Sequence, residues 1–446
     1  MNKEQYLKVL TEQIRCKQAR NPIKNEIENH IEDQIEAFKM EGMNEGEAQE
    51  AALREMGDPV EVGNSLDRIH RTKMPWKEIF VIGILGICGI GLQYFLQQSF
   101  QVQDYSIGGN LTKQVFFLIV SLVFMIGICL FDYSWIGYYA KEIMVMMSVV
   151  IILGQKLFGT MVNGASRWIY FGGIGFSIPM LLLLFIPLYG AILYSYRGQN
   201  YKAIIKSILW MLPGVMIGFM CSSSYTVIVL VFSFNVLLTI AVCRRWYHVS
   251  SKMTLVIQWG IMLLIPITLL AGTLLNGKSY RIQRLAWIFN LSGALERNYF
   301  LDIIRSIVSG SSLSEFDTSV YGILLGDHLL ACVLSYFGIF AVVVIISVLA
   351  VLFTHFYSIT FRQKNQMGML MGTGCSFIFI LELVLYVLDN LGIVYIGSCY
   401  CPFLTYGGSG MMVTFILFGM ILSITRYENV YPEQGKRKLS VKVTIE

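Results

Sequence analysis

The chain has 446 residues, of which 55% are hydrophobic and only 14% carry a charge. Soluble globular proteins average about 25% charged residues, and the mean hydropathy here is +0.60, so the composition excludes an ordinary soluble protein. Charge divides the chain: residues 1–70 hold nine Lys or Arg and 15 Asp or Glu, whereas the remainder holds 25 and 14. The net charge is therefore −6 for residues 1–70 and +11 for the remainder, and this change predicts a domain boundary near Arg71–Trp76.

The hydrophilic N-terminal segment is expected to form short amphipathic helices, and the first apolar run after it would then serve as the membrane anchor. A helix is predicted from Asn44, with Glu47 three residues on as a capping-box signal, to a stop at Gly57-Asp58-Pro59. The stretch from Met40 to Leu66 resembles the small helical prefix domain found before many bacterial membrane permeases and sensors. That resemblance implies a cytoplasmic helical domain over residues 1–72, whose charged face is either solvated or docked to a partner.

From Lys77 onward hydrophobic runs follow one another, each close to the ~20 apolar residues that a helix needs to cross a bilayer. Ten spans are predicted, at residues 78–97, 114–132, 140–158, 175–195, 203–220, 222–243, 253–274, 326–353, 368–392 and 406–424. The expected fold is therefore all-α: a polytopic membrane domain of ten transmembrane helices over residues 73–426, with a cytoplasmic basic tail at 427–446.

Basic residues in the short loops set the predicted orientation, because Lys and Arg accumulate on the cytoplasmic side of membrane proteins. They flank the first, fifth, seventh, ninth and tenth spans on one side: Arg68, Arg71, Lys73, Lys77, Arg197, Lys202, Lys206, Arg244, Arg245, Lys252, Arg362, Lys364, Lys436, Arg437, Lys438 and Lys442. Both termini are therefore expected to be cytoplasmic. The long polar loop 276–327 then faces outward, and its own basic residues indicate an external anionic partner.

Three polar stretches beside the spans carry a family resemblance. They are NGASRWIYFGG (Asn163–Gly173), YRIQRLAWIFN (Tyr280–Asn290) and CPFLTYGGSG (Cys401–Gly410). Together with ten spans and this topology they resemble the SEDS family (shape, elongation, division and sporulation), the group of FtsW, RodA and SpoVE, over residues 78–426.

The resemblance implies a multi-pass protein of the bacterial plasma membrane that acts in peptidoglycan biosynthesis, cell shape or cell division. Such proteins polymerise lipid II, the undecaprenyl-pyrophosphate-linked disaccharide-pentapeptide, by glycosyl transfer. A class B penicillin-binding protein (a transpeptidase) is the implied partner, a lipid II flippase role has also been proposed for the family, and no nucleic acid is expected. A divalent cation, Mg or Mn, could accompany the lipid diphosphate; Cys399 and Cys401, two residues apart with no His beside them, predict no metal site.

Candidate lipid II ligands follow from the same motifs. Arg281 and Arg284, three residues apart, would share a helix face and clamp phosphate oxygens, or merely contact lipid headgroups. Arg167 is a further diphosphate ligand or a snorkelling side chain, and Tyr406 and Ser409 are hydrogen-bond donors. The expected structural motif residues are Asn163, Gly164, Trp168, Pro402, Gly407 and Gly408, with Trp168 alternatively an interfacial anchor and the glycines allowing close backbone approach.

The sequence departs from the family at the expected catalytic base, which takes a proton from the acceptor sugar hydroxyl while the diphosphate leaves. Laid without gaps on this chain, the family pattern places its outer-loop Asp at Ala294, which cannot act as a base. Glu296 or Asp302 would have to substitute. The Asp before the eighth span is kept as Asp327.

Other polar positions of the family have changed. Both carboxylates of the Glu-Glu-Leu-Gly element in the eighth span are replaced in Ser335–Gly338. Glu382 and Asp389, seven apart in the ninth span, could form a different interior site, or Asp389 could simply lie in water at the outer mouth of the span.

Three functions stay open. The chain is a lipid II polymerase with a substitute base, or a catalytically impaired lipid II-binding scaffold or regulator of a penicillin-binding protein, or a transporter of the lipid-linked precursor. The Ala294 substitution counts against the first alone.

Overall fold

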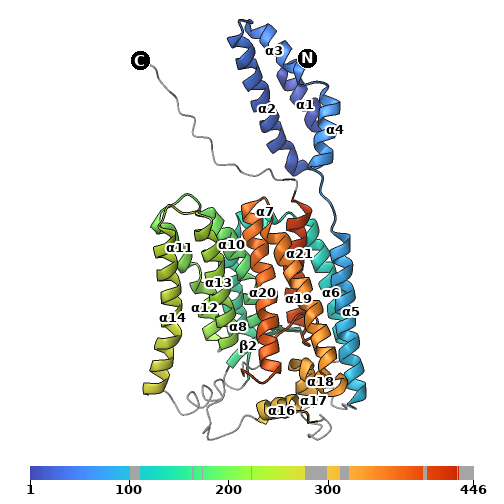
Figure 1. Ribbon diagram of the computed structural model, residues 1–446, viewed down its shortest axis with the longest axis vertical. Coiled ribbons are helices and arrows are strands. Elements are labelled where there is room, and N and C mark those ends of the chain that lie inside the picture. Colours follow the sequence, from blue (N-terminus) through green and yellow to red (C-terminus); the bar gives the residue numbers. More distant parts are fainter. Residues whose placement is uncertain are drawn as a thin grey trace. The chain divides into compact units, whose positions relative to one another are not determined.

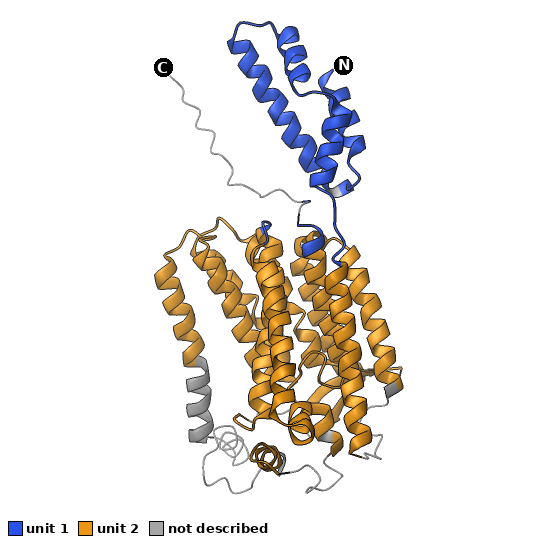
Figure 2. Ribbon diagram, turned by 45° about the vertical axis from the view of Figure 1, so that its right-hand side comes forward, with its two compact units in different colours: residues 1–75, 363–365, 425–446 blue, residues 76–362, 366–424 orange. Residues whose placement is uncertain are grey.

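The computed structural model describes residues 1–100, 111–162, 165–172, 174–221, 223–276, 299–311, 321–394, 399–428 and 430. The chain divides into two compact units (Figure 2). One comprises residues 1–75, 363–365 and 425–446, and the other comprises residues 76–362 and 366–424.

The N-terminal residues fold into four helices, α1 (Lys3–Gln13), α2 (Lys17–Met40), α3 (Glu45–Glu55) and α4 (Pro59–Ile69). The predicted capping box is confirmed: the Glu47 N–H donates to Asn44 Oδ1 at 2.9 Å, and the Asn44 N–H donates to Glu47 Oε2 at 3.5 Å. The residues of the predicted stop also begin the next helix: the Asp58 carboxylate accepts from the Glu61 N–H at 3.1 Å and caps α4. The apolar residues that recur at helical spacing are buried, among them Leu10 and Ile31 at 0% exposure.

The second unit is a bundle of long apolar helices. Its elements are α5 (Trp76–Ser99), α6 (Leu111–Leu130), α7 (Tyr133–Tyr138), α8 (Ala140–Phe158), β1 (Gly159–Val162), β2 (Ala165–Phe171), β3 (Ile174–Ser177), α9 (Ile178–Leu182), α10 (Phe185–Ser195), α11 (Tyr201–Leu209), α12 (Leu212–Met220), α13 (Ser224–Cys243), α14 (Ser251–Asn276), α16 (Tyr299–Val308), α17 (Tyr321–Asp327), α18 (Leu329–Phe337), α19 (Ile339–Phe361), α20 (Gln366–Asn390) and α21 (Gly408–Arg426). Figure 1 shows the long helices side by side, with β2 and α16–α18 gathered at one end of the bundle.

Eight helical segments in the described ranges are long and apolar enough to cross a membrane, so the protein is a multi-pass membrane protein. The count of ten is not confirmed. The runs expected at 140–158 and 253–274 are helical, as α8 and α14, but neither belongs to the eight. Helix α8 carries Lys141, Glu142 and Lys156, and within α14 the apolar helix is Ser251–Leu264.

The span predicted at 326–353 is wrong in its bounds. Gly338, at φ +76°, ends α18, and the membrane helix is α19, from Ile339 to Phe361. The residues before it form the short helices α17 and α18, with Asp327 as the last residue of α17. A glycine with positive φ is a common helix end. Here it separates the membrane helix α19 from the short helices α17 and α18.

Within the polar motif around Arg167, residues Ala165–Phe171 form the middle strand of a three-stranded antiparallel sheet in the order β1-β2-β3. Trp168 pairs with Thr160 on one side and with Ser177 on the other. Pairing satisfies backbone polar groups that would otherwise have no partner near the membrane. The sheet leads directly into α9.

Helix α20 lies at the centre of the bundle and packs against α19, α10 and α13. Small residues allow this: a Cβ at Gly372 would meet Thr360 Cγ2 of α19 at 2.7 Å, and a Cβ at Gly190 of α10 would meet the Leu370 carbonyl oxygen at 3.0 Å. Helix α20 is therefore buried along most of its length, including the polar residues near its end.

Candidate functional site

A cavity of about 160 Å³ opens between the sheet, the starts of α9 and α13, and the segment 399–410. Its lining comprises Arg167, Trp168, Ser177, Pro179, Met180, Ser223, Tyr225, Asp327, Cys399, Tyr400, Thr405, Tyr406, Gly407, Ser409 and Gly410. Six of these, Arg167, Trp168, Asp327, Tyr406, Gly407 and Ser409, are among the residues that the sequence singles out. Among the residues that the structure describes, the charged members of this lining are Arg167 and Asp327, which lie within polar and aromatic walls.

Ser409 ties the two motifs together. Its hydroxyl accepts from the Ser177 N–H at 3.1 Å and donates to the Gly175 carbonyl at 3.0 Å. Both partners belong to β3, which pairs with β2, the strand that carries Arg167 and Trp168. The first turn of α21 therefore holds the sheet over the cavity, across 232 residues of sequence. Ser177 and Ser409 are both buried, so these bonds are shielded from water.

The segment before α21 turns tightly beneath the cavity. The Thr405 hydroxyl accepts from the Cys401 N–H at 2.8 Å, and the Phe403 backbone is left-handed, at φ +68°. Gly407 has φ +152°, a backbone conformation that glycine adopts readily and other residues rarely adopt, which explains the glycine at this position of the motif. The Tyr406 N–H donates to the Gly326 carbonyl at 3.3 Å, which brings α17 and its Asp327 to the cavity.

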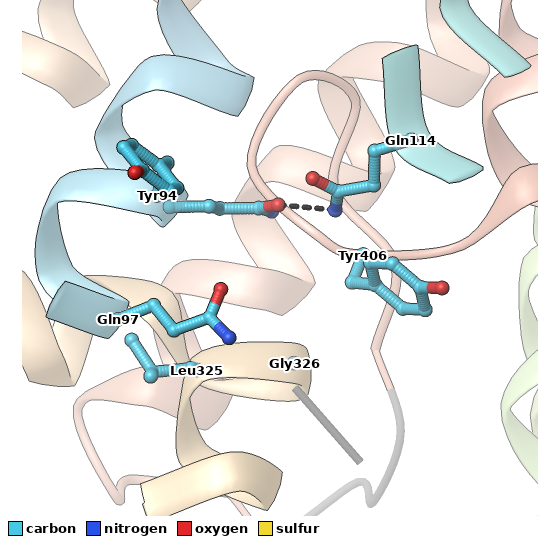
Figure 3. Close-up of a pocket in the computed structure, with 7 residues that line it drawn as sticks. Tyr94, Gln97, Gln114, Leu325, Gly326 and Tyr406 are labelled. Atoms are coloured by element: carbon cyan, nitrogen blue, oxygen red, sulfur yellow. Dashed lines mark hydrogen bonds between the residues drawn. The ribbon is translucent and has the colours of Figure 1, made fainter. Parts of the chain in front are cut away.

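Three glutamines beside this segment are absent from the sequence prediction. Gln93 and Gln97 lie on α5 and Gln114 on α6, and together with Tyr406 they line a second, smaller pocket (Figure 3). Gln114 donates to Gln93, whose own amide donates to the Leu404 carbonyl. Amide groups inside otherwise apolar spans are the sequence signal that marks them. Gln93 and Gln114 thereby hold the backbone two residues before Tyr406.

A buried polar cluster lies behind Asp327, at the end of α20. The His328 Nδ1 atom is 3.3 Å from Asp389 Oδ2, with the side chains 5% and 0% exposed. The expectation that Asp389 lies in water is therefore wrong. Burial lowers the pKa of His328 to about 4, so the imidazole is neutral at physiological pH.

Glu382, seven residues earlier on α20, is 1% exposed. Burial raises the pKa of the Cys399 thiol, and the nearby carboxylates of Asp389, Asp327 and Glu382 raise it further. Cys399 is thus held as the thiol, which is a poor nucleophile. Of these three carboxylates, only Asp327 lines the cavity.

Other candidates lie elsewhere. Asp302 is on α16 and does not line the cavity. Pro402 is buried in the turn segment, and Gly408 begins α21 against Phe117. The predicted Asn163, Gly164, Arg281, Arg284 and Glu296, together with Ala294, lie outside the described residues. Within the described ranges, no three His, Cys, Asp or Glu side chains form a metal-ligand set.

Comparison with known proteins decides the family. The family model described as "Cell cycle protein", for FtsW, RodA and SpoVE, matches residues 78–430. The chain belongs to the FtsW/RodA/SpoVE family. Similar family members include the "Probable peptidoglycan glycosyltransferase FtsW" of Bacillus subtilis (strain 168), 24% identical over 379 residues that cover 80% of this chain and 92% of the relative. The "Peptidoglycan glycosyltransferase RodA" of Treponema pallidum (strain Nichols) is 21% identical over 426 residues, which cover 78% of this chain and 96% of the relative.

Solved structures of the FtsW/RodA/SpoVE type share the fold. A chain from a structure described as "Structural coordination of polymerization and crosslinking by a peptidoglycan synthase complex" matches with a TM-score of 0.64 and 17% identity, over 79% of this chain and 98% of that one. The rod shape determining protein RodA of Thermus thermophilus matches with a TM-score of 0.55 and 16% identity, over 80% of this chain and 97% of that one. At these identities the likeness shows the fold alone.

Proposed function

We propose that this protein binds lipid II at the cavity and polymerises it into glycan strands, as a peptidoglycan glycosyltransferase. The observation that carries the proposal is the cavity itself, where motifs from three distant parts of the chain bring Arg167, Asp327, Tyr406 and Ser409 together. The names of the relatives, peptidoglycan glycosyltransferases FtsW and RodA, support the same reaction.

In this proposal Asp327 is the general base, since among the described residues it is the carboxylate that lines the cavity. It accepts the proton of the acceptor sugar hydroxyl as the acceptor oxygen bonds to the anomeric carbon of the donor. The bond from that carbon to the diphosphate oxygen breaks at the same time, and the diphosphate leaves on its undecaprenyl lipid. Arg167 is placed to attract the diphosphate, because a guanidinium binds phosphate oxygens through paired N–H groups.

A second candidate function rests on Ala294, which stands where the family pattern has its outer-loop Asp. In this alternative the cavity still binds lipid II but does not polymerise it, and the protein acts as a scaffold or regulator of a class B penicillin-binding protein. The description of the structural relative as part of a peptidoglycan synthase complex supports a partner of that kind.

Purified protein in detergent, given labelled lipid II, separates the two functions. We expect polymer from the wild type, loss of polymer with retained lipid II binding in Asp327→Asn, and weaker binding in Arg167→Ala. Asp302→Asn and Glu296→Gln are matched carboxylate controls and should retain activity. Polymer lost in one of these controls but kept in Asp327→Asn would move the base to that residue. Binding without polymer in the wild type would favour the scaffold.

We also propose a bacterial plasma-membrane location with both termini cytoplasmic. Gln93, near the end of α5, bonds to the segment beside the cavity, so the cavity lies at the end of α5 away from Trp76. The basic residues before α5 would keep that start cytoplasmic and place the cavity at the outer face. Reporter fusions at the two termini test this: alkaline phosphatase active at either terminus would overturn it.

A further inference from the structure

The corner between α17 and α18, which carries Asp327, has no cap of its own. Helix α18 begins after His328, and no side chain of its own segment caps it. The first N–H groups of a helix have no partner within the helix and need one from elsewhere when they are buried. Here the Leu329 N–H takes its acceptor from α20, and the Ala331 N–H is shared between an acceptor of α20 and the His328 carbonyl of its own segment.

Three residues within one turn of α20 hold this corner. The Tyr386 hydroxyl accepts from the Leu329 N–H at 3.0 Å, and Asn390 Oδ1 accepts from the Ala331 N–H at 3.2 Å. Asp389 lies 3.3 Å from the His328 imidazole. Tyr386, Asp389 and Asn390 occupy positions i, i+3 and i+4, which share one helix face.

The residues that make these contacts are buried from water, and one further bond within α20 orients Asn390. Tyr386, Asp389 and Asn390 are 0%, 1% and 2% exposed, and His328 is 4% exposed. The Asn390 amide also donates to the Tyr386 carbonyl at 2.9 Å, which fixes its side chain on α20. Tyr386 and Asn390 supply the hydrogen bonds of this corner, and Asp389 adds a close contact to the His328 imidazole.

We propose that Tyr386, Asp389 and Asn390 form a polar clamp that positions Asp327 in the cavity by fixing the α17–α18 corner to the central helix. None of the three belongs to the motifs that carry the family resemblance. The clamp rests on the proposed function only in the part that makes Asp327 the catalytic base. The clamp residues are positioning residues, since they do not line the cavity themselves.

Hydrogen–deuterium exchange of the full-length protein in detergent tests the clamp without any activity. Tyr386→Phe removes one acceptor atom, and exchange of the peptide that contains the Leu329 amide should quicken about tenfold, as expected for the loss of one hydrogen bond. Asn390→Leu should quicken exchange of the Ala331 amide by less, because that N–H also donates to the His328 carbonyl at 3.1 Å. Tyr336→Phe is the matched control, because Tyr336 lies at the far end of α18 with its side chain 47% exposed. Unchanged exchange in both clamp variants would overturn the proposal.

Lipid II turnover then tests positioning as distinct from stability. At a temperature well below unfolding, Tyr386→Phe and Asp389→Asn should lower kcat about tenfold or more and leave KM within about twofold, because a small misplacement of a catalytic group slows the chemical step. Equal kcat in wild type and clamp variants would leave the clamp purely structural and overturn its positioning role. Absence of polymer from the wild type would refute the proposed function, while the exchange result would still decide whether the clamp exists.

Discussion

The hydroxyl of Ser409 offers a sharp test of how the cavity is built. Ser409→Ala deletes the bonds to the Ser177 N–H and to the Gly175 carbonyl and leaves a buried N–H without its acceptor. An orphaned buried donor costs about 1–3 kcal/mol, and the second bond contributes about 1 kcal/mol, so we expect a loss of about 2–4 kcal/mol. The sheet that carries Arg167 would loosen, and lipid II binding should weaken with it.

Thermal unfolding of the purified protein in detergent, followed by tryptophan fluorescence, measures this loss. Because 1 kcal/mol shifts Tm by about 2–4 °C in domains of 150–250 residues, and by less in larger units, we expect Tm to fall by about 3–6 °C. Ser148→Ala is the matched control: that hydroxyl bonds the Met144 carbonyl of its own helix at 2.8 Å, and no N–H loses its acceptor. Equal Tm values for the two variants would refute the reasoning.

Three further predictions concern other parts of the chain. Gly89→Ala should cost about 1–3 kcal/mol, because the new Cβ would overlap the Phe403 carbonyl oxygen; Gly91→Ala on the same helix meets open space, and Tm should separate the two. The pKa of His328 is about 4 in the folded chain against an ordinary 6.5, so between these pH values the folded state binds fewer protons than the unfolded state. The free energy of unfolding should therefore fall by up to about 3 kcal/mol as pH drops from 6.5 to 4. His328→Gln should flatten the dependence of Tm on pH over this range. Asn44→Ala should destabilise α3 by about 0.5–2 kcal/mol and speed amide exchange at Glu47, and equal exchange in both proteins would contradict the capping role.

Local signals in the sequence predicted local structure well. Signals that involve only residues close in sequence were sufficient for three features: the Asn44 capping box, the Gly57-Asp58-Pro59 stop and the long apolar runs. The structure contains the corresponding helices. The break at Gly338 was not predictable from hydropathy, because one glycine barely changes the mean over an apolar run. The strands around Arg167 have mixed apolar and polar residues in a short motif, a pattern that does not distinguish a strand from a loop.

The composition of the site was partly predictable. Arg167, Tyr406 and Ser409 come from motifs, and the structure places them on one cavity. Which atoms meet is decided by tertiary packing, so the bond of Ser409 to Ser177 and the contact of His328 with Asp389 have no local signal. Asp389 illustrates the difference. Its position near the end of a predicted span favoured an exposed side chain, whereas in the structure the start of α18 covers it.

The bond between Ser177 and Ser409 also sets when the site can exist during synthesis. A membrane protein is made and inserted from its N-terminus, so the sheet and most of the membrane helices are complete before α21 leaves the ribosome. The acceptor for the Ser177 N–H arrives only with that last helix. A chain that stops short of Ser409 can therefore insert most of its helices yet lacks the bonds that complete the cavity.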